Sequence, residues 1–275
     1  MKNYIEYTFT VSQIDCVDEL IAILSEYSFE GFEYTDFGFK AYVLQEHNNE
    51  TLWKDECSQI DKGIQYTSKA LPNINWNAEW EKNYDIVNVN DKCVIYAPFH
   101  TIDSSIQYPL LITPKMSFGT GHHATTWMMC NLLFDLDLKD KTVIDIGCGT
   151  GVLGILSAKL GAKTIVAIDN DEICKENAEE NAQNNNVNIK VYHDTIQSYV
   201  KNFPTAKFDI VIANIQKNVI LQDLSYYKEI INGNGYLLLS GILHQDEQDI
   251  LKATSPLEHI KTLRKNEWSA LLLKN

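Results

Sequence analysis

The sequence predicts an α/β protein with a mainly parallel sheet that ends in an antiparallel hairpin, preceded by a small α+β domain. Three observations predict this fold class. Strand and helix patterns follow the order βαββαβ over about the first 70 residues. From Lys141 onward, short apolar runs alternate with helical segments, which is typical of a parallel sheet with right-handed crossovers. The last two strand-like runs are joined by a turn that is too short for a parallel crossover.

The N-terminal domain, residues 1–71, is predicted to be ferredoxin-like. Its first strand is "IEYTFTV", in which apolar and polar residues alternate. A helix follows, and "FEGFEYTDFGFKAYVLQ" predicts two strands with a turn near Asp36 to Gly38. A second helix, from Trp53 to Ile60, and the strand "GIQYTSKAL" complete the domain. Because this fold serves many functions, it assigns none by itself.

A linker is predicted over residues 72–91, "PNINWNAEWEKNYDIVNVND", because this stretch is polar, begins with proline and has no clean period. We expect Trp76 and Trp80 either to pack on a neighbouring surface or to anchor a short helix. The second domain is therefore predicted to span residues 92–275.

Seven strands are expected in the sheet of the second domain. Five are predicted from the runs "TVIDI", "TIVAID", "IKVYH", "FDIVIAN" and "GYLLLSG". Helices are predicted between them, from "VLGILSAKL", "DEICKENAEENAQNN" and "NVILQDLSYYKEI". The last two strands, Leu257 to Leu263 and Trp268 to Leu273, are joined by the turn "RKNE" and form the antiparallel hairpin.

The charge of the chain is strongly negative, with 23 basic and 37 acidic residues and a net charge of −14. Residues 1–70 hold 13 acids and 5 lysines, a net charge of −8. Nucleic acid is a poor partner for such a surface, because binding it depends on basic side chains. The charge favours a basic protein partner, although solubility alone also explains it.

Export, membrane insertion and metal binding are not expected. No apolar run approaches the ~18 residues that a membrane helix needs. The N-terminus, "MKNYIEYTFT", lacks an apolar signal core, so we expect a cytoplasmic protein, and we expect a monomer. The six cysteines are scattered without a C-x-x-C pair, which predicts reduced thiols and neither a zinc site nor a disulfide framework.

The run "VIDIGCGTGVLG", Val143 to Gly154, predicts a strand, a glycine loop and a helix. Glycines let the backbone approach a ligand, and the helix N-terminus offers free N–H groups to an anionic group. The glycines are Gly147, Gly149, Gly151 and Gly154. Asp169 ends the next strand, where a carboxylate suits the two hydroxyls of a ribose.

Three cofactors compete for this loop. A nucleoside triphosphate loop needs a Gly-Lys pair, which is absent here. A dinucleotide motif, G-x-G-x-x-G, is matched literally, but Asp145 would repel a pyrophosphate and attract a cation. S-adenosylmethionine carries an ammonium and a sulfonium. The pattern D-x-G-x-G-x-G, followed by an acid that ends the next strand, resembles the seven-stranded S-adenosylmethionine-dependent methyltransferases.

The strand "FDIVIAN" ends at Asn214 and is followed by "IQKN". In the methyltransferases that this chain resembles, the corresponding loop lies beside the transferable methyl group. Many that act on amino groups have Asn or Asp followed by Pro-Pro and an aromatic residue, and "NIQK" departs from that version. Asn214 is also a common type of turn residue, but ligands of open α/β sheets bind at strand ends.

The run "MSFGTGHHATT", Met116 to Thr126, lies ahead of the glycine loop. It has no H-E-x-x-H zinc motif and no phosphate-loop lysine. We predict a lid that bends at its two glycines and leads into a helix at Thr125 and Thr126. His122 is expected to face solvent or to start the helix, and Phe118 is a candidate either for the site or for the core.

Several runs together resemble the ribosomal protein methyltransferases that modify protein L-eleven of the large subunit. They are "FGTGHHATT", "VIDIGCGTGVLGILSAKLGA", "AIDND", "IVIANI", "GYLLLSGIL" and "EWSALLL". The resemblance extends from about Trp76 to the C-terminus, with Ala124 where the family often has proline. It implies an S-adenosylmethionine site lined by Thr126, Gly147, Gly149, Gly151, Asp169 and Asn214, with Phe118 and His123 closing over it.

The function implied by the resemblance is transfer of methyl groups to lysine side chains or the N-terminal α-amine of protein L-eleven, with Asn214 in the catalytic role. The family has a small ferredoxin-like domain on a mobile linker, which agrees with the pattern of residues 1–91. Three alternatives stay open at this point: a methyltransferase with another substrate, a nicotinamide-dependent oxidoreductase, and a cofactor-sensing module without turnover.

Overall fold

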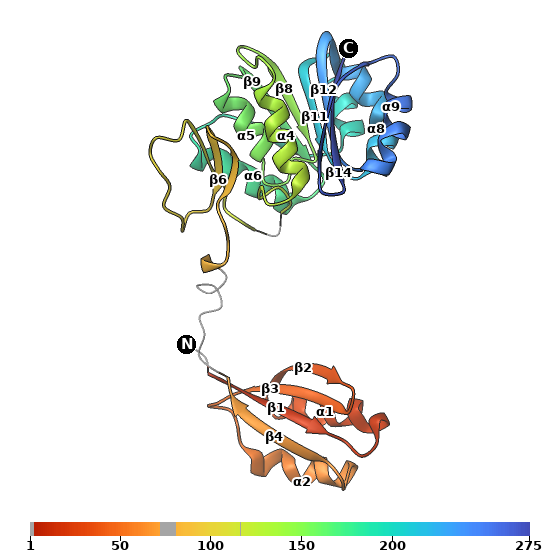
Figure 1. Ribbon diagram of the computed structural model, residues 1–275. Coiled ribbons are helices and arrows are strands. Elements are labelled where there is room, and N and C mark those ends of the chain that lie inside the picture. The colour runs from red at the N-terminus through yellow and green to blue at the C-terminus, as the bar shows by residue number, and fades with distance from the viewer. Residues whose placement is uncertain (1–2, 72–80, 116) are drawn as a thin grey trace. The chain divides into compact units, whose positions relative to one another are not determined.

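The structure is a computed structural model that describes residues 3–71, 81–115 and 117–275. The chain forms two compact units, Met1–Asn83 and Tyr84–Asn275, each with its own apolar core (Figure 1). The predictions for Trp76 and Trp80 lie outside the described residues.

Within residues 3–71, the N-terminal unit has four strands and two α-helices in the order βαββαβ. They are β1 (Tyr4–Thr10), α1 (Val17–Glu26), β2 (Phe29–Thr35), β3 (Gly38–Leu44), α2 (Glu50–Ile60) and β4 (Gln65–Ala70). The strands form one antiparallel sheet in the order β2-β3-β1-β4.

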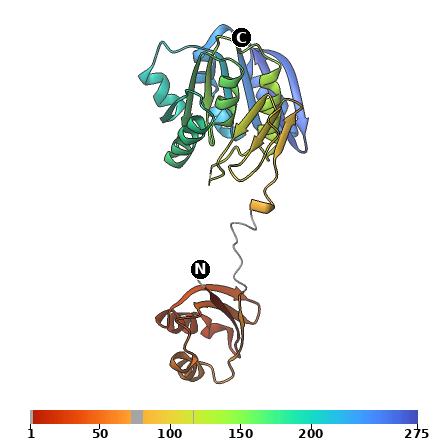
Figure 2. The same ribbon diagram turned by 90° about the vertical axis from the view of Figure 1, so that its left-hand side faces the viewer.

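One face of this sheet is apolar because alternate residues of β1 and β3 point the same way. Tyr7 and Phe9 are buried on it, and both helices cover this face (Figure 2). The Trp53 ring of α2 lies 5.3 Å from the Tyr7 ring and 5.7 Å from the Phe9 ring, both in edge-to-face contacts. Burial of each such side chain contributes about 1.5–3 kcal/mol, so this cluster fixes the register of β1.

The C-terminal unit is built on a seven-stranded sheet. The strands are β8 (Thr142–Ile146), β9 (Thr164–Asp169), β10 (Lys190–His193), β11 (Phe208–Asn214), β12 (Ile231–Leu243), β13 (Glu258–Lys265) and β14 (Trp268–Lys274). Their order is β10-β9-β8-β11-β12-β14-β13, and β14 runs in the opposite direction to the other six strands. The predicted α/β fold, with a mainly parallel sheet and a terminal hairpin, is confirmed.

Helices cover both faces of this sheet (Figure 1). One face packs against α4 (Ala124–Phe134), α5 (Val152–Lys159) and α6 (Glu172–Asn184), and the other against α7 (Ile196–Asn202), α8 (Lys217–Ile230) and α9 (Glu247–Thr254). Both faces are covered, so the central strands are apolar without alternation. Among the described residues, no helix combines the length and the hydropathy needed to cross a membrane.

A small second sheet was not predicted. It consists of β5 (Val87–Asn90), β6 (Cys93–Tyr96) and β7 (Tyr108–Leu111). The predicted linker, 72–91, is corrected at its end, because β5 belongs to the C-terminal unit. Four residues of alternation in "VNVN" give too weak a periodic signal, and the strand is held by tertiary contacts, such as the hydrogen bond from Trp127 Nε1 to the Asn88 carbonyl.

The order of the strands places a ligand crevice at the end of β8. The chain goes from β8 to β9 on one side and returns to β11 on the other, which makes the space between β8 and β11 a topological switch point. Ligands of open α/β sheets bind outside the carboxyl ends of strands at such a point. The predicted site residues of the glycine loop, Asp169 and Asn214 all follow or end strands at this edge.

Candidate active site

The glycine loop between β8 and α5 turns sharply above the end of β8. Gly147 has a φ of 67° and Gly149 a φ of 53°, in the region that favours glycine. A Cβ atom at Gly149 would lie 2.2 Å from the Phe118 carbonyl oxygen, and one at Gly147 would lie 2.4 Å from the Ile215 side chain. Both positions therefore require glycine for the loop to keep this path.

Asp169, the last residue of β9, fixes this loop from below. Its Oδ2 accepts a hydrogen bond of 2.9 Å from the Gly149 N–H, and its Oδ1 accepts one of 3.1 Å from the Asp171 N–H. Each carboxylate oxygen can accept a second bond. The side chain can therefore hold the loop and still offer two acceptors to neighbouring hydroxyl groups.

Asn214, the last residue of β11, lines the crevice. Its Nδ2 donates to Thr126 Oγ1 of α4 at 3.5 Å, and the residue is 9% exposed. Its Oδ1 is buried and has no hydrogen-bond partner in the described part of the chain. A buried acceptor without a partner costs about 1–3 kcal/mol, so this oxygen is suited to a ligand that brings an N–H or O–H donor.

The lid predicted from "FGTGHHATT" forms a wall of the same crevice. The Phe118 carbonyl accepts a hydrogen bond of 2.9 Å from the Thr150 N–H, and Thr150 Oγ1 donates to the Gly119 carbonyl at 2.8 Å. The two glycine-rich runs are thus bonded to each other.

His123 links this wall to α4 and to the terminal hairpin. It is the N-cap of α4, and its Nδ1 accepts from the Thr125 N–H. Its ring centroid lies 5.2 Å from that of Phe118 and 4.9 Å from that of Trp268, at the start of β14. The three rings make one aromatic side of the crevice.

Six of the eight predicted site residues line one cleft with a volume of about 520 Å³. They are Phe118, His123, Gly147, Gly149, Asp169 and Asn214. Thr126 lines a small cavity beside it, shared with Phe118, Gly147 and Asn214. Gly151 lines neither cavity, and instead caps α5 with a φ of 78° and packs against Ala178.

Asp145 differs from its predicted role as a carboxylate that faces a cation. It is 1% exposed and lies under the loop, where its Oδ2 accepts a hydrogen bond of 3.1 Å from the Gly154 N–H of α5. Burial raises the pKa of this carboxyl to about 7, and the nearby Asp169 charge also raises it. The hydrogen bond from the Gly154 N–H opposes this shift, because it stabilises the ionised carboxylate. Asp145 therefore shapes the loop and does not line the cleft.

A second cleft of about 380 Å³ was not predicted. It shares Gly147, Asp169 and Ile215 with the first cleft and extends past the end of β10. Asp194 and Thr195, which follow "IKVYH", line this extension. Their position after a predicted parallel strand was a usable signal, because every such strand ends at this edge. Trp268 was missed as a lining residue because the packing of the hairpin, and not its period, brings it here.

Comparison with known proteins identifies the family. The model of the family described as ribosomal protein L11 methyltransferase (PrmA) matches residues 10–275. The chain belongs to the ribosomal protein L11 methyltransferase (PrmA) family. The resemblance found in the sequence is therefore confirmed, and so is its class of function, that of a protein methyltransferase.

Individual members of the family are similar over almost the whole chain. A protein from Porphyromonas gingivalis, named ribosomal protein L11 methyltransferase, is 37% identical over 98% of this chain and 97% of its own length. One of the same name from Bacteroides thetaiotaomicron is 36% identical, with 98% of both chains covered. A crystal structure of ribosomal protein L11 methylase from Lactobacillus delbrueckii subsp. bulgaricus superimposes with a TM-score of 0.64 and 26% identity, covering 69% of this chain and 98% of that one.

The chemistry of the cleft fits the cofactor that a methyltransferase of this fold class uses. Gly147 and Gly149 of the glycine loop line the cleft, Asp169 offers acceptors for a ribose, and Asn214 has a free acceptor. The residues that the structure describes contain no group of three or more His, Cys, Asp or Glu side chains that could hold a metal ion.

Proposed function

We propose that this chain is an S-adenosylmethionine-dependent N-methyltransferase that modifies amino groups of ribosomal protein L11. Membership of the family supports the substrate. The observation that carries the chemistry is the free Oδ1 of Asn214, a buried hydrogen-bond acceptor on a residue that lines the cleft.

The cofactor would be held by the glycine loop and the strand ends around it. Gly147 and Gly149 line the cleft and would contact the cofactor, Asp169 would accept hydrogen bonds from the ribose, and the second cleft with Asp194 has room for the base. Phe118, His123 and Thr126 would close the other side. When bound, S-adenosylmethionine supplies a methyl group on a positively charged sulfur.

The residues of the chain have two tasks, to orient an amine and to keep it neutral. Asn214 Oδ1 would accept an N–H of the amine and so direct its lone pair toward the cleft; a correct orientation of this kind is a large part of catalysis. A free lysine costs about 4.6 kcal/mol to deprotonate at pH 7, and an α-amine about 1 kcal/mol. Phe118, His123 and Trp268 form an aromatic side of the cleft, and desolvation beside it would lower the pKa of a bound amine.

The N-terminal unit is proposed as a ferredoxin-like substrate-recognition domain over residues 1–71, followed by a linker and a catalytic domain. Its element order and its sheet order β2-β3-β1-β4 support the fold. Its net charge of −8 over residues 1–70 supports a basic protein as the partner. We propose that the activity is cytoplasmic, because the proposed substrate is a ribosomal protein, and the monomeric state stays a prediction.

The test is incubation of the purified chain with the separated large-subunit proteins and S-adenosylmethionine labelled in the methyl group. We expect label on protein L11 alone, at amino groups located by mass spectrometry. Label on another protein would favour the alternative of a different substrate. Binding of NADH in place of S-adenosylmethionine would overturn the proposal altogether.

A further inference from the structure

The first residues of the C-terminal unit are attached to the lid that walls the cleft. His122 is exposed, as predicted, but its Nε2 lies 2.9 Å from the Asp85 carbonyl oxygen. The Tyr84 ring lies 4.5 Å from the His122 ring in an edge-to-face contact, and the Tyr84 hydroxyl is hydrogen-bonded to the Thr120 side chain. Two consecutive residues thus contact Thr120 and His122 of the lid.

His100 holds the same segment from its other side. Its Nδ1 accepts from the Ala97 N–H at 3.0 Å, which leaves Nε2 as the protonated nitrogen, and Nε2 donates to the Tyr84 carbonyl at 2.6 Å. The backbone of Tyr84 and Asp85 is therefore bonded at both carbonyl groups, once to the body of the unit and once to the lid.

The attachment continues along α4, which carries site residues. Trp127 Nε1 donates to the Asn88 carbonyl at 3.1 Å, and Asn131 Nδ2 lies 3.5 Å from the Val89 carbonyl. His123 and Thr126, which wall the cleft and its side cavity, lie on the same stretch as these donors. The segment after the linker thus follows the lid and α4 over several residues.

We infer that His122 and Tyr84 are positioning residues that hold the lid, Phe118 to His123, in its place over the cofactor cleft by attaching it to the end of the linker. The ends of the lid are held by the bonds of Phe118 and Gly119 to Thr150 and by His123, which caps α4. Between them, Gly119 and Gly121 have φ values of 104° and 95°, and Gly121 is buried beside Ile95. Thr120 and His122 add the contacts of this stretch to Tyr84 and Asp85.

The direct test is amide hydrogen exchange of the full chain without added cofactor. In His122→Ala, amides of residues 119–123 should exchange about five-fold faster, the effect of one lost hydrogen bond, with an unchanged melting temperature. His122→Gln keeps a side-chain N–H donor and should restore slow exchange. Tyr84→Phe, which keeps the ring, should show a smaller effect. The matched control is His259→Ala, an exposed histidine bonded to Thr262 on β13, which should leave the lid unchanged.

A second measurement connects the lid to the site, and this part rests on the proposed function. By titration calorimetry, His122→Ala should bind S-adenosylmethionine about five-fold more weakly, and His122→Gln should bind it as the wild type does. Unchanged exchange in His122→Ala overturns the attachment, and faster exchange with an unchanged Kd overturns its role at the site. If the wild type does not bind S-adenosylmethionine, the proposed function fails while the exchange result still decides whether His122 holds the lid.

Discussion

In the side-chain amide of Asn214, the Nδ2 group has a hydrogen-bond partner among the described residues and the Oδ1 atom has none. The Nδ2 group donates to Thr126, a residue with no exposed surface, so the amide is held in one orientation. The Oδ1 atom is buried without a hydrogen-bond partner among the described residues, and Asn214 lines the cleft. An acceptor that is already oriented costs little to use when a ligand arrives, so we expect Asn214 to act without the Pro-Pro-aromatic sequence that "NIQK" lacks.

Replacement of this side chain should impair turnover more than cofactor binding. In Asn214→Ala, we expect kcat to fall about 10- to 100-fold, the equivalent of one or two lost hydrogen bonds in the reacting complex. The Kd for S-adenosylmethionine, measured by calorimetry, should change less than about three-fold on the same scale. Asn232→Ala is the control, since Asn232 bonds Asp209 at the start of β11. A wild-type kcat in Asn214→Ala would exclude Asn214 from catalysis.

The buried carboxyl of Asp145 predicts that the stability of the fold depends on pH. The pKa of its carboxyl is raised from 3.8 to about 7 in the folded chain, so the folded state binds more protons than the unfolded state between these values. Stability should therefore fall as pH rises from about 4 to 7, with a slope of up to about 1.4 kcal/mol per pH unit from this group. Asp145→Asn should remove this slope and gain stability relative to the wild type at pH 8.

Urea unfolding of both proteins at pH 5, 6 and 8 measures the difference. Asp209→Asn is the matched control, because hydrogen bonds from Thr142 and Asn232 outweigh burial and lower the pKa of Asp209. The difference in unfolding free energy between Asp209→Asn and the wild type should not change over this pH range. A constant difference between Asp145→Asn and the wild type would show that Asp145 is ionised throughout.

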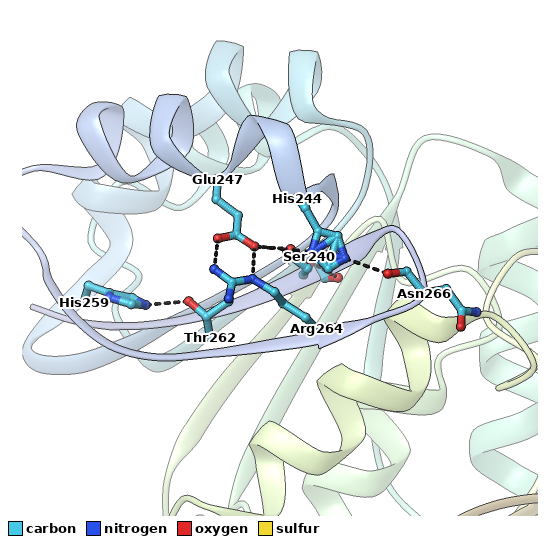
Figure 3. A network of polar contacts seen from close by, with 8 residues as sticks. Ser240, His244, Glu247, His259, Thr262, Arg264 and Asn266 are labelled. Carbon is cyan, nitrogen blue, oxygen red and sulfur yellow. Dashed lines mark hydrogen bonds and ion pairs between the residues drawn. The ribbon is translucent and has the colours of Figure 1, made fainter.

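At the scale of elements, one buried acid joins α9 to the terminal hairpin (Figure 3). Glu247 accepts from Arg264 Nε at 2.7 Å and from Arg264 Nη2 at 2.6 Å, and it also accepts from the Ser269 hydroxyl. Ser240 Oγ of β12 donates to the Ser269 carbonyl at 2.8 Å. Gly241, which follows Ser240, and Trp268, which precedes Ser269, line the cleft, so this network supports that side of the cleft.

The network predicts a loss of stability in acid. The hydrogen bonds from Arg264 lower the pKa of Glu247 from 4.5 to about 2. Burial opposes this shift, and the hydrogen bond from Ser269 adds to it. A lowered pKa in an acid stabilises the fold above pH 4.5, and this contribution is lost as pH falls toward 2. Glu247→Gln should cost about 2 kcal/mol at pH 7, the value of a charged hydrogen bond, and less at pH 3.

Chemical denaturation at pH 7 and pH 3 tests this expectation. Asp249→Asn serves as a control on the same helix, because its carboxylate is exposed and pairs with Lys217 on the surface. Exposed pairs contribute little, about 0–1 kcal/mol. An equal cost of Glu247→Gln at both pH values would mean that the charge of Glu247 contributes nothing and that packing explains the loss.

The elements that the sequence predicted well are those with long apolar periods or fixed turn chemistry. The strands around Asp169 and Asn214 are continuous apolar runs, and the "RKNE" turn allowed only an antiparallel hairpin. The strand of Val87–Asn90 and the Trp268 side of the cleft were missed because packing between distant segments determines them. Asp145 was predicted from its chemistry alone, and no period in the sequence shows that its carboxyl turns under the loop toward Gly154.

At the scale of the whole molecule, charge and chemistry are divided between two units. The predicted site residues lie in Tyr84–Asn275, whereas residues 1–70 carry −8 of the net charge of −14. Each unit buries its own apolar core. A chain made of residues 84–275, which keeps Tyr84 and the attached lid, should therefore retain the cofactor site without the acidic surface.

The last prediction separates cofactor binding from recognition of the protein. The chain of residues 84–275 should bind S-adenosylmethionine within about three-fold of the full chain, but its kcat/KM for protein L11 should fall by about 100-fold or more, since the loss of several charged contacts weakens encounter and binding.

In the full chain, KM for protein L11 should rise between 50 and 300 mM salt, roughly as screening shortens the reach of charges. In one variant, three exposed acids of the N-terminal unit are changed to amides: Glu19, Glu26 and Glu46. In the control variant, three exposed acids of the C-terminal unit are changed in the same way: Asp91, Glu229 and Glu267. Both variants change the net charge equally, so only a location effect can raise KM in the first and not in the second. Equal effects would mean that the overall charge, and not the N-terminal unit, attracts the substrate.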